Sequence, residues 1–230
     1  MKQARILKYI ISYIALAISL SSFSQSKDTI PHTSAYGLRL GVDISKPILG
    51  MIDSNSSGIE FVADYRVSKN WYVAAEIGSQ KERTIEDYTT SSSKGNFLKI
   101  GVNYNAYENW LDMNNEIYVG MRYGTSSFDQ TLDSYKINTG SDYFASNTIT
   151  TPITTTDLNA HWTEFVMGIK VETFKNLYLG FSFHYKVMLS LTNPTNFKTL
   201  FVPGFNRVFA TETGFGFNYT ISYTIPFVNK

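Results

Sequence analysis

The chain has 230 residues, no cysteine, and 20 basic against 19 acidic residues, with a mean hydropathy of −0.14. This length suits one all-β domain with a closed core, and the balanced charge argues against a strongly basic nucleic-acid binder. Without cysteine there is neither a disulfide framework nor an acceptor for the lipid of a bacterial lipoprotein.

The first 24 residues follow the plan of a secretory signal peptide. Three basic residues precede an apolar run over 9–20, and small residues in 22–24 precede a cut before Gln25. The run is too short to span a membrane as a helix, so we prefer a removed signal to a membrane anchor. Its removal leaves 17 basic and 19 acidic residues. The polar residues 25–35 are predicted to form a flexible lead-in segment.

Eight later segments alternate between an apolar face and a polar face, which is the two-residue period of a β-strand. The clearest is 214–227, where aromatic and β-branched residues occupy one face and glycine and small polar residues the other, up to Pro226. The predicted strands are 36–44, 58–67, 71–80, 96–105, 116–125, 162–173, 177–191 and 214–227.

The links between these strands alternate in length. Those after the second, fourth and sixth strands are short, and the longer ones are 46–57, 81–95, 126–161 and 192–211. Short periplasmic turns and long external loops are typical of an outer-membrane barrel. We therefore predict an eight-stranded antiparallel up-and-down transmembrane β-barrel over 36–227, in the outer membrane of a Gram-negative bacterium. The Thr-rich stretch 148–156 is predicted to lie in an exposed, mobile loop.

Alternation alone does not say which face points inward, and a soluble lipocalin-like barrel with an apolar interior is the alternative. Eleven strand glycines fall on the polar face. If this face points into a small barrel, glycine is favoured there because it leaves space for the large side chains of the crowded interior. The apolar face is almost free of charge, and its aromatic residues gather near the strand ends, as interface girdles do. Trp162 does not fit this pattern, because its parity places it on the polar face.

Charged side chains on the polar face would then line the interior and must pair, because isolated buried charge is costly. We predict a network that fills the lumen and leaves no large conductance. Its predicted members are Arg39, Asp43, Glu60, Asp64, Arg66, Glu76, Lys99, Glu116, Arg122, Glu164, Lys170, Glu172, His184 and Lys186.

No catalytic, cofactor or metal motif is recognised in the sequence, and we expect a protein that is not an enzyme. His161 is expected at the outer rim near Asp157, His184 inside the barrel, and His32 in the lead-in segment. There is no G-x-S-x-G elbow and no H-E-x-x-H zinc motif. A lipid-modifying enzyme that uses His161 stays a third hypothesis.

With these residues laid out, the mature chain resembles small outer-membrane β-barrels of the OmpA/OmpX-like class. The resemblance is carried by the leader, the eight alternating strands and the terminal pattern 217–227. More narrowly, 36–43 and 64–76 are similar to an uncharacterised, domain-of-unknown-function group of Bacteroidota barrels. The resemblance implies a fold and a location. The tail 228–230 departs from the class, where an aromatic residue usually ends the chain.

The leading functional hypothesis is a structural or surface-interaction protein, with 126–161 and 201–209 as contact surfaces. A narrow porin-like channel or small-solute transporter is the alternative, and conductance separates the two. The expected partners are outer-membrane lipids and, during biogenesis, the barrel-assembly machinery, with no nucleic acid and no cofactor.

Overall fold

The computed structural model describes residues 35–108, 114–137, 148–195 and 197–229. The predicted signal peptide and residues 25–34 lie outside this part of the chain, while Ala35 already belongs to the first strand. No helix among the described residues is long and apolar enough to cross a membrane.

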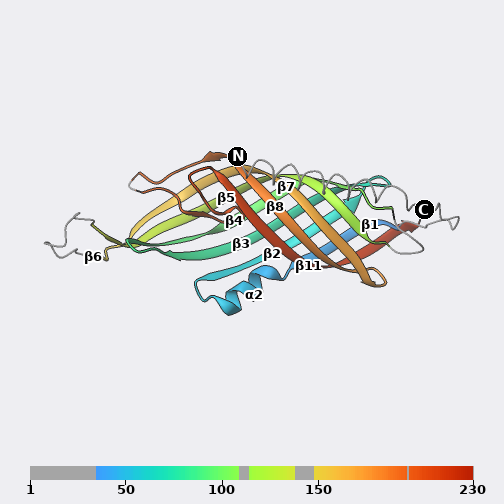
Figure 1. Ribbon diagram of the computed structural model, residues 1–230, viewed down its shortest axis with the longest axis horizontal. Coiled ribbons are helices and arrows are strands. Elements are labelled where there is room, and N and C mark those ends of the chain that lie inside the picture. Colours follow the sequence, from blue (N-terminus) through green and yellow to red (C-terminus); the bar gives the residue numbers. More distant parts are fainter. Residues whose placement is uncertain (1–34, 109–113, 138–147, 196, 230) are drawn as a thin grey trace, which may run out of the picture. The chain divides into compact units, whose positions relative to one another are not determined.

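Eight antiparallel strands form a closed ring (Figure 1). Each pairs with its neighbours in the order β4-β3-β2-β1-β11-β8-β7-β5, and β5 pairs back with β4. All eight predicted strands are therefore present. They are β1 (Ala35–Asp43), β2 (Ser56–Arg66), β3 (Trp71–Ile85), β4 (Thr89–Asn105), β5 (Glu116–Lys136), β7 (Ile153–Phe174), β8 (Leu177–Leu191) and β11 (Thr213–Asn229).

Four strands are longer than predicted by five residues or more. The links expected at 81–95 and 126–161 are largely strand, because β3, β4, β5 and β7 continue past the rest of the ring and stay paired with one another. In these continuations both faces of a strand carry polar residues, such as Ser92 and Thr131. The alternation between apolar and polar residues that predicts a strand is therefore lost there. The Thr-rich stretch is correspondingly not a plain loop, since it contains β6 (Thr148–Ile149) and the start of β7.

Two other links also contain ordered elements. The link after β1 forms the helix α2 (Ser45–Ile52), and the link after β8 forms a small hairpin of β9 (Phe201–Val202) and β10 (Asn206–Arg207). Short turns at 67–70 and 175–176 lie at the opposite end of the strands, as predicted, and β4 ends and β5 begins at that same end. We call the end of the ring with the short turns the turn end, and the opposite end the loop end.

The apolar face of the strands points outward. Phe61, Ile100, Met121 and Phe217 are about half exposed. Each is followed or preceded by a buried polar residue, which is Glu60, Lys99, Arg122 and Asn218 respectively. An apolar interior of the lipocalin kind is thus wrong for this chain. The outward aromatic residues at the strand ends include Trp71 and Tyr104, whose ring centroids lie 5.1 Å apart. The polar and charged side chains therefore lie inside the ring, and they form the candidate functional site.

Candidate functional site: the charged interior

The half of the interior nearer the turn end is organised around Arg39. Its guanidinium binds Glu116 through two parallel hydrogen bonds of 3.0 and 2.9 Å, and it also contacts Asp64 at 2.7 Å. Lys170 pairs with the same Asp64, and the guanidinium carbon of Arg39 lies 4.7 Å from the ring centre of Tyr178. Because β1 and β5 lie on opposite sides of the ring, the Arg39–Glu116 pair ties two opposite walls together.

The half nearer the loop end is organised around Lys99. Its ammonium nitrogen lies 3.0 Å from Glu60, 2.8 Å from Glu76 and 3.9 Å from Glu164. The guanidinium of Arg122 donates to Glu76 at 3.1 Å and to two backbone carbonyls. Two or more hydrogen-bonding partners for each charge are what a buried ion pair needs to offset desolvation.

Lys46 completes the network and was not predicted to belong to it. It extends from α2, in a segment expected to be a loop, and its Nζ lies 2.7 Å from Glu60 and 3.4 Å from Asp43. With Lys46 included, the buried interior holds six cations (Lys46 and the buried Arg39, Lys99, Arg122, Lys170 and Lys186) and six carboxylates (Asp43, Glu60, Asp64, Glu76, Glu116 and Glu164). This balance removes any single-sign ring of the kind that selects ions.

Two predicted network members lie elsewhere. Arg66 donates to the backbone carbonyl of Lys69 in the first turn, and Glu172 accepts from Asn114 at 3.0 Å and from the backbone of Asn176 at 2.7 Å. Both are partly exposed at the turn end, so they fasten turns and do not join the buried pairs. Sequence parity places them on the inner face, and both stand among the last two residues of the predicted strands 58–67 and 162–173, next to the turns that they contact.

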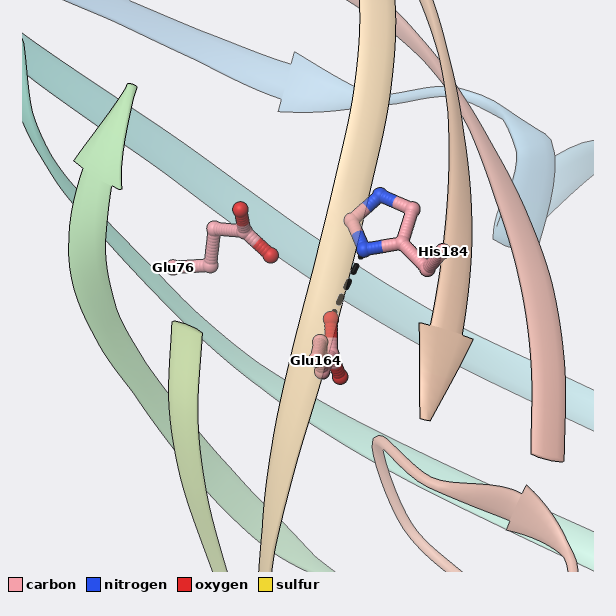
Figure 2. A group of neighbouring side chains, drawn as sticks. All are labelled: Glu76, Glu164 and His184. Carbon is pink, nitrogen blue, oxygen red and sulfur yellow. Dashed lines mark hydrogen bonds and ion pairs between the residues drawn. The ribbon is translucent and has the colours of Figure 1, made fainter. Parts of the chain in front are cut away.

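A hydrogen-bonded chain runs through His184. Figure 2 shows the imidazole beside Glu164, with Nδ1 2.7 Å from a carboxylate oxygen, and Nε2 lies 2.9 Å from the hydroxyl of Ser182. The other Glu164 oxygen accepts from the indole N–H of Trp162 at 2.7 Å. Serine, histidine and a carboxylate in this order resemble a hydrolytic triad, which sequence reasoning missed because Ser182 has no motif around it.

The surroundings of this chain do not suit acyl transfer. Ser182 lines a cavity of about 30 Å³, room for about two water molecules and not for a substrate. Ser182 also lies in the middle of β8, paired with Gly168 and Asn218 of the neighbouring strands. Backbone N–H groups in such a position donate to the neighbouring strands, so they do not form an oxyanion hole. The arrangement acts as a buried polar support for Glu164.

Glu76, Glu164 and His184 also offer three potential metal ligands within 4.8 Å of one another. Figure 2 shows that the three side chains come from different strands and point toward a common region. The Lys99 ammonium already contacts both carboxylates, and Arg122 contacts Glu76. A divalent cation would have to displace Lys99, so the residues present fit an internal ion-pair cluster better than a metal centre.

Toward the loop end the charged network gives way to an apolar cluster inside the ring. The hairpin of β9 and β10 folds inward, and Val202 and Phe205 are fully buried. Phe205 meets Trp162 edge to face at 5.9 Å, and Lys186 donates to the carbonyl of Gly204 at 2.6 Å. The cluster consists of Phe97, Phe128, Leu158, Ala160, Trp162, Met188, Val202 and Phe205.

These positions correct one expectation and agree with another. The segment 201–209 was predicted to be a contact surface, but most of it is buried, and its outward apolar group is Phe209. Trp162, which did not fit the outer girdles, lies inside the ring, where Gly124 makes room for it, because a Cβ at that glycine would overlap the indole. Within the described ranges, no side-chain hydrogen bond joins the His161 imidazole to a serine or an aspartate. The imidazole contacts the hydroxyl of Tyr123 at 3.0 Å, and His32 lies outside the described residues.

Comparisons with known proteins give a family and a distant structural likeness. A family profile described as a domain of unknown function (DUF6048) matches residues 6–230. The crystal structure of Ail, the attachment invasion locus protein of Yersinia pestis, is similar with a TM-score of 0.41 and 10% identity, covering 84% of this chain and 99% of that one. No curated protein matches the sequence.

Proposed function

Because the chain belongs to the family described as a domain of unknown function (DUF6048), we propose its function from the geometry of the ring: it is an outer-membrane β-barrel, closed to solutes, that carries a strand extension for contacts at the cell surface. The observation that carries the proposal is the combination of an apolar exterior with an interior whose charges pair internally.

The outward face of β3 has the dimensions that a membrane requires. From Trp71 to Ser79 its outward residues carry no charge, and Lys81 is the first outward charge beyond them. At ~3.3 Å per residue and a strand tilt of ~40°, the distance from Trp71 to Lys81 is ~25 Å along the barrel axis, which is the height of the apolar band of an outer-membrane barrel. Such a surface would be costly in water and is favourable against lipid tails.

The interior supports a closed barrel over the alternative of a channel. The cavity beside Arg39 has about 20 Å³ and the one beside Ser182 about 30 Å³, which is room for about one or two water molecules each. On the loop-end side of these cavities, the inward hairpin fills the ring with apolar side chains, including Val202 and Phe205. An ion crossing the ring would have to break buried ion pairs and then pass this apolar cluster.

We expect no stable conductance steps when the purified protein is inserted into a planar lipid bilayer. The physical reason is the filled lumen, and the measurement is single-channel current over a range of voltages. Insertion is verified on the same preparation by the shift in gel mobility on boiling, which marks a folded barrel. Regular current steps that scale with protein concentration would replace the closed barrel by the narrow-channel alternative.

The extension beyond the apolar band supplies the surface for contacts. Past Lys81 on β3 and Lys94 on β4, outward residues are mostly polar or charged, and Arg83 pairs with Asp133 at 3.7 Å. At the far end of the β3–β4 hairpin, Ile85 and Tyr88 are exposed together. Exposed apolar groups within a polar extension are typical of a site for protein contact.

The absence of native cysteine allows a clean test of this orientation. We expect Tyr88→Cys at the loop end to react with a membrane-impermeant maleimide in intact cells. Lys69→Cys, exposed in a turn at the other end, should react only after the outer membrane is permeabilised. Labelling of Lys69→Cys but not Tyr88→Cys in intact cells would reverse the orientation, and equal labelling of both would argue against a membrane-spanning ring.

A further inference from the structure

Toward the loop end the closed ring has a gap between β2 and β11, because β1, which separates them, is shorter than both. β1 ends at Asp43, whose last ladder partners are Thr220 on β11 and Glu60 on β2. Both neighbours continue toward the loop end, to Thr213 and Ser56, and within the described ranges no strand pairs with these two edges. The helix α2 lies at this place, on the outside of β2 and β11 (Figure 1).

The side chain of Asp43 ends β1 and starts the helix. One carboxylate oxygen accepts from the backbone N–H groups of Ser45 and Tyr219, both at 3.0 Å, so it replaces a strand partner on β11. The other oxygen accepts from the Ser45 hydroxyl at 2.8 Å. Pro47 then occupies the first turn of α2, where a missing N–H costs nothing.

α2 is fastened to β2 and leaves a groove toward β11. A Cβ at Gly50 would lie 2.9 Å from the backbone oxygen of Ser56, so the helix and β2 approach each other as closely as glycine permits. On the other side a groove of about 280 Å³ opens beside Leu49. Its apolar lining residues are Leu49, Phe183, Phe215 and Phe217, and its polar lining residues are Ser45, Lys46, Gln80 and Asn206.

The groove is continuous with the apolar exterior. Phe183, Phe215 and Phe217 are outward residues of β8 and β11 that belong to the exposed apolar face. The outer side of α2 extends this face, since Ile48, Leu49, Met51 and Ile52 are all exposed. A short helix with four exposed apolar residues suits a lipid interface.

We infer that this groove binds one acyl chain of a membrane lipid, an inference that rests on the membrane location proposed above. The acyl chain enters from the apolar exterior, because the phenylalanine residues that line the groove are part of that exterior. At about 280 Å³ the groove has roughly nine times the volume of the cavity beside Ser182, which suits a flexible chain and is too small for a folded segment. A solute arriving from the interior would first meet the filled charged network.

Photo-crosslinking in nanodiscs tests this site. The probe is phosphatidylethanolamine with a diazirine on one acyl chain, diluted into unlabelled phosphatidylethanolamine, and crosslinks are mapped by peptide mass spectrometry. We expect residues 213–217 to be labelled several-fold more than the outward face of β4, which reports ordinary surrounding lipid. Leu49→Trp should fill the groove and reduce this ratio to that of β4. Met51→Trp, exposed on the same helix but outside the groove, should leave the ratio unchanged.

Equal labelling of β11 and β4 in the wild-type protein would overturn the groove while leaving the membrane barrel intact. An excess on β11 that Leu49→Trp does not reduce would overturn it as well. If the outward face of β4 is itself unlabelled, the membrane location fails instead. The wild-type ratio decides by itself should Leu49→Trp not fold.

Discussion

Replacing Lys99 with methionine is expected to lower the free energy of unfolding by about 3–5 kcal/mol, the cost of removing one partner from a buried ion pair. Methionine keeps most of the volume but removes the only charge of the side chain. Glu60, Glu76 and Glu164 then lose their shared cation. Each keeps one other cation in contact, but the interior is left with five cations for six carboxylates. Guanidinium unfolding in lipid vesicles, followed by the heat-dependent gel shift, measures the loss.

A second substitution separates the charge effect from a packing defect. Adding Glu76→Gln to Lys99→Met removes the surplus negative charge, and we expect it to recover a substantial part of the lost stability. Lys175→Ala, in an exposed turn, is the matched control and should change stability by less than about 0.5 kcal/mol. Equal effects of Lys99→Met and Lys175→Ala would contradict a tightly paired interior.

Replacing Phe205 with alanine is expected to release the inward hairpin. The side chain is fully buried against Trp162, and truncating a buried phenylalanine costs about 3–5 kcal/mol. If 3 kcal/mol of this favours local opening, the open population rises about 100-fold, since each 1.4 kcal/mol is tenfold. Trypsin cleavage after Arg207, which lies in the hairpin, should accelerate accordingly.

Phe209→Ala is the control for this prediction. Phe209 belongs to the same link but is 48% exposed, so its truncation should leave the cleavage rate near that of the unmodified protein. Similar acceleration by both substitutions would mean that the link opens as a flexible loop. The conductance of Phe205→Ala should remain absent, because the charged network below the hairpin still fills the ring.

The eight strands were predictable because each carries a contrast between its two faces. Outward residues such as Ile100 and inward ones such as Lys99 alternate in every segment that lies in the apolar part of the ring. Past that part the contrast vanishes, so the sequence predicts loops where β3, β4, β5 and β7 continue as strands. Their strand form comes from pairing with neighbours that are already strands, which is a tertiary effect.

Parity also indicated which charges point inward, but not which of them meet. Arg39 binds Glu116 across the ring, and Lys170 binds Asp64 across it as well. These pairings depend on the register around the closed ring, which no local pattern encodes. Phe205 and Lys46 were missed for a related reason: each lies in a segment with loop-like composition and is buried only through contacts with distant strands.

The pairing of β1 with β11 bears on the order in which the molecule folds. This ladder joins Val42 to Ile221, near the two ends of the described chain, whereas the other ladders of the ring join strands adjacent in the chain order of the main strands. Contacts of such large sequence separation form late, since most of the chain must be ordered first. The cross-ring pair of Arg39 and Glu116 must wait for the same event. Until then the inner face is an open, charged sheet that water can solvate, so desolvation of the ions is postponed to the final step of assembly.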